Sequence, residues 1–176
     1  MRHVAFLRGI NVGKAKRVAM ADLRTLLESM GYQDVATLLN SGNIVFTAPP
    51  KLKGDHAARI EKGIAAKLGV QSKVTVLTAQ ELAEVVKGNP HLKVGHDHSR
   101  LLVAFLAESA DRAALKAIAA KAWEPGAFAV TRRAAYLWCP EGILDSPLAV
   151  QFGKVLKDQQ TSRNWATVLK ITALCK

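Results

Sequence analysis

The amino-acid sequence predicts an α+β protein built from two tandem ferredoxin-like halves, residues 1–79 and 80–176, with a further helix at the C-terminus. Three observations lead to this prediction. Apolar segments of strand length alternate with segments of helical periodicity in the order β-α-β-β-α-β across the first half. The second half repeats most of that order. The length of 176 residues suits one compact domain or two small halves that share a core.

In the first half we predict a strand at each of four short apolar or alternating segments, residues 3–8, 35–39, 44–46 and 73–78. Apolar residues at helical spacing predict helices over residues 20–30 and 55–68, and Gly31 and Gly69 supply the stop signals. Residues 9–17 are rich in glycine and positive charge and are predicted to be a loop. The polar residues 40–43 form the turn of a hairpin.

The second half begins with a helix over residues 79–87, for which Thr78 and Glu81 make a capping box. Three strands follow from the same patterns, at residues 100–107, 127–131 and 135–139. We predict the remaining helices over residues 110–122, 147–156 and 164–174. The last helix then takes the place of a fourth strand, and Thr161 or Ser162 caps its N-terminus.

A net charge of +11 is the one unusual global property of the chain. The first 80 residues carry an excess of 7 positive charges and the rest an excess of 4. Two cysteines are too few for a disulfide framework, and a reducing cytoplasm is the simplest location. No apolar run approaches the roughly 20 residues of a membrane helix, so we expect no membrane partner.

The segment from Arg8 to Lys14 leaves a strand and leads towards a helix. Its glycines allow backbone N–H groups to converge on an anion, and Arg8 and Lys14 add positive charge beside Asn11. The spacing matches neither a Walker loop nor a dinucleotide fingerprint. A phosphate-binding loop is therefore one interpretation, and a long connection whose glycines only form turns is the other.

Two further polar motifs stand out. Asn40, Ser41 and Asn43 place three hydrogen-bonding side chains in one hairpin turn, although turns favour such residues for backbone reasons as well. Arg163 and Asn164 lie at the start of the predicted last helix, where the helix dipole attracts anions. Trp165 is expected in the core. The spacing leaves open whether the three motifs meet in space.

Little in the sequence supports metal binding, catalysis or base stacking. His91, His96 and His98 are interpreted as part of a solvated loop, because no second set of metal ligands lies nearby, and we expect neither a metal site nor a cofactor. No catalytic triad is apparent. The apolar strand from Leu101 to Leu106 indicates a sheet covered on both faces, which argues against base stacking on an open sheet as in RNA-recognition domains.

Several segments resemble a bacterial family labelled domain of unknown function 1697. They are Ala5–Gly13, Met20–Leu23, Leu39–Phe46 and Thr161–Val168. The resemblance implies two tandem ferredoxin-like halves and no particular activity. In that family a second glycine often follows the position of Gly13, where this chain has Lys14.

Three functional hypotheses follow. In the first, basic loops bind a phosphate-bearing ligand, either nucleic acid or a phosphorylated, nucleotide-like small molecule. The candidate binding residues are Arg8, Asn11, Lys14, Asn40, Ser41, Asn43, Arg163 and Asn164. In the second, the protein is an enzyme acting on a small anionic substrate, with the cations stabilising charge and the asparagines orienting groups. In the third, it is an interaction module without chemistry.

Overall fold

A computed structural model describes all 176 residues of the protein. The protein is α+β, with six α-helices and two four-stranded antiparallel sheets. The chain forms two compact units, Met1–Leu82 with Ile171–Lys176, and Ala83–Lys170. The two boundaries fall within helices α3 (Ala79–Lys87) and α6 (Trp165–Leu174). Each unit is described separately below.

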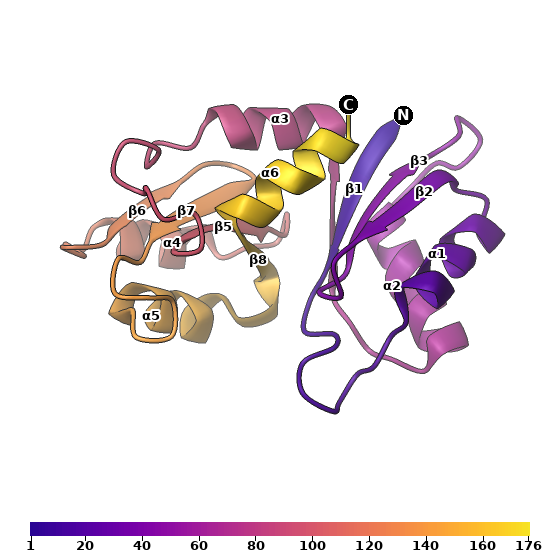
Figure 1. Ribbon diagram of the computed structural model, residues 1–176, viewed down its shortest axis with the longest axis horizontal. Helices are drawn as coiled ribbons and strands as arrows, with labels where there is room; N and C mark the ends of the chain where they lie inside the picture. Colours follow the sequence, from indigo (N-terminus) through magenta and orange to yellow (C-terminus); the bar gives the residue numbers. More distant parts are fainter. The chain divides into compact units, whose positions relative to one another are not determined.

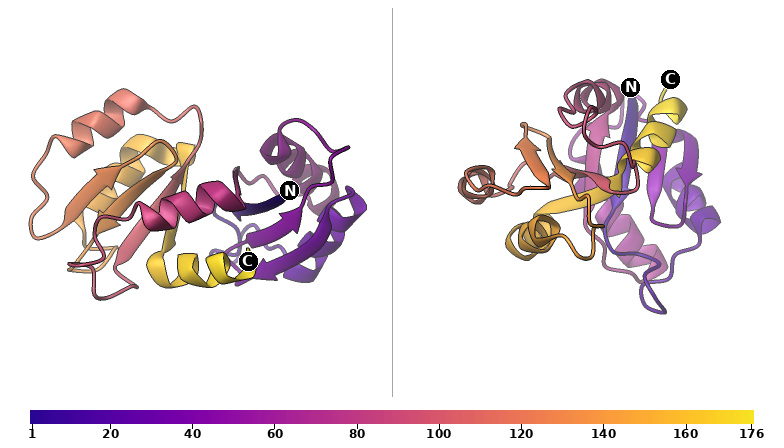
Figure 2. Two further views of the ribbon diagram at one scale, coloured as in Figure 1. Left: turned by 90° about the horizontal axis from the view of Figure 1, so that it is seen from above. Right: turned by 60° about the vertical axis from the view of Figure 1, so that its left-hand side comes forward.

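The first unit holds one sheet with two helices on one of its faces (Figures 1 and 2). Its strands follow the order β2-β3-β1-β4, and β1 pairs antiparallel with both of its neighbours. The elements are β1 (Arg2–Leu7), α1 (Met20–Ser29), β2 (Gln33–Leu38), β3 (Asn43–Thr47), α2 (His56–Leu68) and β4 (Val74–Thr78). The predicted β-α-β-β-α-β order is therefore observed, with small differences at the element ends.

Apolar side chains from the sheet and from both helices form the core of this unit. Leu23 and Leu27 of α1 and Ile60 of α2 are fully buried together with Leu7 and Phe46 of the sheet. The helical spacing recognised in the sequence thus marks the faces that α1 and α2 turn towards the strands. The side chains on the other face of β1, such as Val4 and Phe6, are fully buried as well, so the sheet presents no open face there.

The second unit contains a sheet with the strand order β6-β7-β5-β8. This is the order of the first sheet, with β5, β6, β7 and β8 in the places of β1, β2, β3 and β4. Its elements are β5 (Leu101–Leu106), α4 (Arg112–Ala119), β6 (Ala127–Val130), β7 (Ala134–Trp138), α5 (Pro147–Leu156) and β8 (Gln160–Asn164). A short 3₁₀ turn, Lys157–Gln159, connects α5 to β8. The four consecutive residues Val103–Leu106 of β5 are all fully buried, which confirms that both faces of this strand are covered, because successive side chains point to opposite faces.

Strand β8 corrects the prediction for the end of the chain. Gln160–Asn164 pairs antiparallel with β5 and completes the second sheet, and the last helix begins only at Trp165. The sequence concealed this strand because Gln-Thr-Ser-Arg-Asn is polar throughout and lacks the apolar alternation that predicts a strand. Pairing with β5 therefore determines its conformation, which is a tertiary effect.

Helix termini were predicted with mixed success. The capping box at α3 is confirmed, because Thr78 Oγ1 accepts from the Glu81 N–H at 3.1 Å and Glu81 Oε2 accepts from the Thr78 N–H at 2.9 Å. The helix predicted over residues 110–122 is shorter, and its N-cap is Asp111, whose carboxylate accepts from the Ala114 N–H at 2.9 Å. No helix in the chain has both the length and the apolar character needed to cross a bilayer.

A cluster of aromatic and histidine rings lies in the first unit, away from the end of β1 that carries Arg8. The His3 ring stacks on Phe46 with ring centres 5.4 Å apart, and the His56 ring meets His3 edge-on at 5.0 Å. The hydroxyl of Tyr32, which is buried, lies 3.0 Å from His56 Nδ1. Burial lowers the pKa of both histidines, and the charge of Arg59 lowers that of His56 further.

We expect this cluster to make the protein less stable as the pH falls from 7 to 5. The pKa values of His3 and His56 are lower in the folded state than their ordinary value of 6.5, so the unfolded chain takes up protons first. Their contribution to stability is complete above pH 6.5 and decreases below it. Urea unfolding at several pH values measures the effect. The variant His56→Gln should flatten the profile, whereas His98→Gln, at an exposed position, should leave it unchanged.

Candidate functional site

Three segments that are distant in the sequence meet at one edge of the first sheet. Because β1 runs antiparallel to β3 and to β4, the end of β1 lies beside the starts of both neighbours. We call this the loop edge. It consists of the basic loop (residues 8–19), the turn at residues 39–42 and the segment 71–73. The predicted motifs around Arg8 and Asn40 are therefore brought together, a question that the sequence had left open.

The side chain of Asn11 connects the basic loop to the turn. Its Nδ2 donates to the carbonyl of Asn40 at 2.7 Å and to that of Val18 at 2.9 Å, and its Oδ1 accepts from the Val18 N–H at 2.8 Å. The Asn11 N–H donates to the Lys16 carbonyl at 3.0 Å. Asn11 has a positive φ of 54°, which asparagine tolerates better than most residues. Asn11 thus holds the loop in one conformation.

The turn at residues 39–42 is also held against β1. The Leu7 N–H donates to the carbonyl of Gly42 at 2.9 Å, and a β-carbon on Gly42 would lie 2.8 Å from both Leu7 Cβ and Ile10 Cδ1. Asn43 is buried, and its Nδ2 donates to the Leu38 carbonyl at 2.7 Å and to Ser41 Oγ at 3.1 Å. The amide of Asn43 therefore stabilises the turn from inside.

The basic loop carries its positive charge outward. Lys14, Lys16 and Arg17 are exposed, and no acidic residue occurs in the first 21 positions of the chain. An antiparallel bridge between Val12 and Ala15 closes the tip of the loop around Gly13 and Lys14. The loop is therefore a narrow projection with a cluster of cations, which favours contact with an anion.

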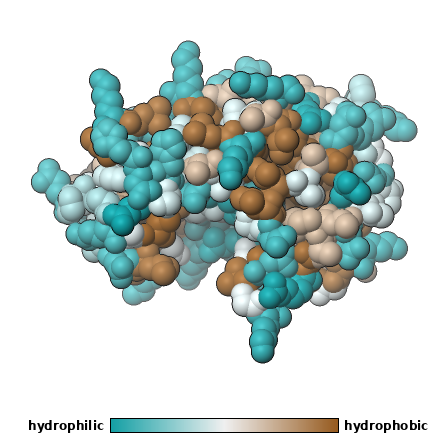
Figure 3. All heavy atoms as spheres, viewed as in Figure 1, coloured by the Kyte–Doolittle hydropathy of each residue, from teal (hydrophilic) through white to brown (hydrophobic).

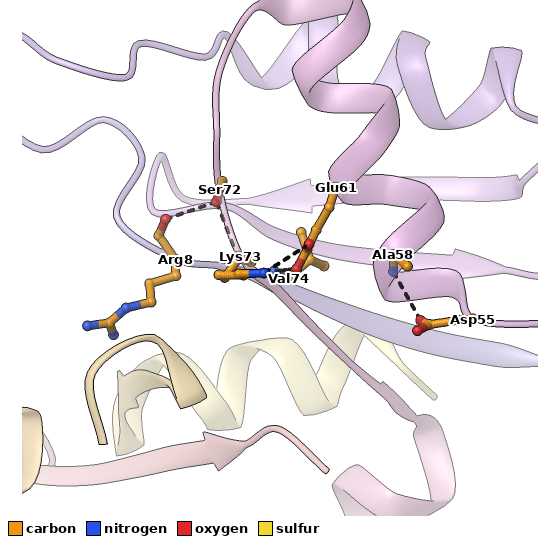
Figure 4. Close-up of polar contacts among 7 residues, drawn as sticks. All are labelled: Arg8, Asp55, Ala58, Glu61, Ser72, Lys73 and Val74. Carbon is orange, nitrogen blue, oxygen red and sulfur yellow. Dashed lines mark hydrogen bonds and ion pairs between the residues drawn. The ribbon is translucent and has the colours of Figure 1, made fainter. Parts of the chain in front are cut away.

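Arg8 stands where β1 passes into the basic loop. Its carbonyl accepts from Ser72 Oγ at 2.9 Å, and its N–H donates to the Lys73 carbonyl at 2.9 Å. Figure 4 shows the guanidinium of Arg8 pointing away from Glu61, whose carboxylate lies 3.6 Å from Lys73 Nζ and accepts from the Val74 N–H. Glu61 thus offsets the charge of Lys73. It forms no ion pair with Lys14, Lys16 or Arg17.

Arg163 and Asn164 belong to the second unit, and each makes a hydrogen bond within its own segment. Arg163 lies in β8 opposite Val103, and its Nη1 donates to the Ser162 carbonyl at 2.8 Å. Asn164 Oδ1 accepts from the Thr167 N–H at 2.9 Å, so Asn164 caps α6. The prediction that Thr161 or Ser162 caps this helix is wrong, because both residues lie within β8.

The second unit has a different connection at the position that corresponds to the basic loop. Residues 107–111 lead from β5 to α4, contain Glu108 and Asp111, and include no lysine or arginine. The Asp111 N–H donates to Gln159 Oε1 at 2.7 Å, and Glu108 lies 3.8 Å from Arg133. The cationic projection is therefore a property of the first unit and not of the strand arrangement.

The histidine-rich segment does not assemble a metal site. His91 is buried, and its Nε2 lies 3.2 Å from the carbonyl of Tyr136, so it is not part of the solvated loop that was predicted. Burial lowers the pKa of His91. His96 and His98 are exposed. No group of three or more histidine, cysteine or acidic side chains in the chain is arranged to hold a metal ion.

Sequence reasoning missed several residues that shape the loop edge. Val18 and Ser72 hold the basic loop through a backbone group and a hydroxyl, and neither residue belongs to a recognisable motif. Lys16 and Arg17 contribute as much exposed charge as Lys14. The local density of positive charge signalled these two cations, whereas nothing in the sequence pointed to Ser72, which lies 64 positions away from its partner, Arg8.

Fold and site together define a two-unit α+β protein with a cationic loop at one sheet edge. The sequence profile of a family described as "Protein of unknown function (DUF1697)" matches residues 1–136. The chain belongs to this family, as the resemblance of its motifs indicated.

A solved structure supports the fold over the whole chain. It is "The structure of conserved bacterial protein SP0830 from Streptococcus pneumoniae", with a TM-score of 0.73 and 23% sequence identity. The similarity covers 99% of this chain and 98% of that one. No curated protein matches the chain.

We expect Asn11→Asp to lower the free energy of unfolding by about 1–3 kcal/mol, because the substitution removes the donor to Asn40 and Val18 and turns an oxygen towards their carbonyls. Urea denaturation measures the change. Asn40→Ala is the matched control, since the bond uses the backbone carbonyl of Asn40, which alanine retains. An equal loss in both variants would contradict the role given to the Asn11 amide.

Two glycine substitutions should separate backbone strain from steric contact. Gly13 and Gly42 both have positive φ, but a β-carbon has open space at Gly13 and lies 2.8 Å from neighbouring carbons at Gly42. Gly13→Ala should therefore cost about 1–2 kcal/mol from strain alone. Gly42→Ala should cost about 1–3 kcal/mol more. Thermal unfolding compares the two, and similar losses would show that the turn can move away from Ile10.

Proposed function

We propose that the protein binds a phosphate-bearing ligand, a nucleic acid or a nucleotide-like molecule, through the basic loop of its first unit. The observation that carries this proposal is the exposed cluster of Lys14, Lys16 and Arg17 on a loop held in one conformation by Asn11. A loop that is already ordered loses little further conformational entropy on binding, which favours affinity. The net charge of +11 adds long-range attraction for polyanions.

The uses of the polar side chains favour binding over catalysis. The amides of Asn11 and Asn43 are engaged with backbone groups of their own loop and turn. They therefore act by shaping the loop edge, and the cations are the groups directed to a ligand. The carboxylate of Glu61 at this edge is engaged with Lys73 and the Val74 N–H, so ligand binding is the function that we propose.

The finer assignments of fold and location belong to the same proposal. The strand order β2-β3-β1-β4, with a helix after β1 and another after β3, supports a ferredoxin-like arrangement in the first unit, and the second unit repeats that order. Cys139 and Cys175 are both free thiols, which suits the reducing cytoplasm that we propose as the location.

A salt titration tests the proposed function. Three neutralised phosphates predict a slope of about −2.7 for the logarithm of the association constant against that of salt concentration on duplex DNA. The affinity should then fall roughly 40-fold between 50 and 200 mM salt. Fluorescence anisotropy with a labelled duplex or a labelled nucleoside triphosphate measures it.

A matched pair of variants assigns the binding to the loop. Lys14→Gln with Arg17→Gln should weaken binding and reduce the slope by about 1.8. Lys51→Gln with Lys53→Gln removes the same charge from exposed positions between β3 and α2 and should have a much smaller effect. Equal effects of the two pairs would mean that overall charge, and not the basic loop, binds the ligand.

A further inference from the structure

Two apolar side chains lie among the cations of the loop edge. Val12 is 69% exposed and Leu39 is 48% exposed. They adjoin Asn11 and Asn40, which are joined by a hydrogen bond of 2.7 Å. Figure 3 shows brown and teal side chains next to one another where this loop protrudes at the lower edge of the view. A ligand that offers only phosphate would leave both apolar side chains in water, so a partner with apolar groups beside its phosphates fits this surface better.

The shape of the basic loop limits the partner further. The bridge between Val12 and Ala15, followed by the bond from the Asn11 N–H to the Lys16 carbonyl at 3.0 Å, makes the tip a tight turn with Gly13 and Lys14 at its end. Chain segments bridged in this way lie about 5 Å apart, and the major groove of B-form DNA is about 12 Å wide, so it has room for the turn. Val12, Gly13 and Ala15 add little bulk around Lys14, so the tip can enter the groove with it.

Resting on the proposed function, we propose that the partner is duplex DNA and that the tip of the basic loop enters its major groove. Lys14 then reaches guanine O6 and N7, and Val12 contacts thymine methyl groups, which are the apolar features of that groove. Lys16 and Arg17 lie further back along the loop and contact the phosphates. The salt slope on duplex DNA should then be about −1.8, because only two of the three cations neutralise phosphates, and Lys14→Gln with Arg17→Gln should reduce it by about 0.9.

Other nucleic acids fit this edge less well. None of the residues 8–19, 39–42 and 71–73 is aromatic, so the loop edge has no platform on which unpaired bases would stack. The major groove of A-form RNA is deep and narrow, and side chains do not reach its base edges. The loop edge should therefore distinguish duplex DNA from both single strands and duplex RNA.

Binding of the full chain to three probes at 50 mM salt tests the proposal. The probes are a mixed-sequence DNA duplex of 16 base pairs, the RNA duplex of the same sequence and the single DNA strand. We expect the DNA duplex to bind about tenfold more tightly than either of the others. Methylation of guanine N7 in the duplex should be hindered by the protein, and a drug that occupies the minor groove should not displace it.

Variants of the apolar residues add a test that charge alone does not affect. Val12→Ser should weaken duplex binding roughly three- to tenfold while leaving the salt slope unchanged. Leu39→Asn suits the positive φ of 59° at that position and should act in the same direction. Val150→Ser, at a position that is 59% exposed on α5, is the matched control and should have no effect. All three side chains are exposed, so the folded state should tolerate the changes, and circular dichroism checks this.

The outcomes separate the two proposals. Equal, salt-dependent binding of all three probes would overturn the major-groove proposal and leave the proposed function standing. A preference for the single strand or for duplex RNA, or displacement by the minor-groove drug, would likewise overturn it. If no nucleic acid binds at 50 mM salt while a nucleoside triphosphate does, the duplex proposal fails and the proposed function is retained for a small ligand. Binding of none of these probes would overturn both.

Discussion

The antiparallel pairing of β1 with β3 and β4 is the constraint on which the candidate site depends. It brings the basic loop, the turn at residues 39–42 and the segment 71–73 to the same edge of the sheet, although they are far apart in the sequence. Backbone bonds from Leu7 to Gly42 and from Arg8 to Lys73 then secure that edge. A shift of one residue in either pairing would turn the alternate side chains of β1 to opposite faces and move the loop relative to the turn.

Shape and charge are supplied by different residues at the loop edge. The side-chain amides of Asn11 and Asn43 donate to backbone carbonyls of the loop and the turn, so they stabilise the path of the chain there. The side chains of Lys14, Lys16 and Arg17 lie outside that network and remain exposed. Asn11 and Asn43, which the sequence suggested as ligand-binding residues, thus hold the loop and the turn, and the exposed cations are the groups that we propose to face a ligand.

The sequence predicted most helices and strands because their apolar periodicity and caps are local properties. Gly69 ends α2, and α5 spans Pro147–Leu156, as predicted. Strand β8 could not be predicted in the same way, since its polar residues become a strand only by pairing with β5. The meeting of the basic loop with the turn was also out of reach, because the bond from Asn11 to Asn40 spans 29 positions and depends on the register of the sheet.

Because the two sheets share one strand order, the second unit can serve as an internal control for the first. One sheet continues from its first strand into a cationic projection, and the other continues from the equivalent strand into the acidic connection at residues 107–111. Solvent, temperature and chain concentration are identical for both at every moment. Amide chemical shifts recorded during a titration could therefore be compared between the two connections within a single spectrum, and a non-specific ionic response would be read directly from the second unit while the first reports any binding beyond it.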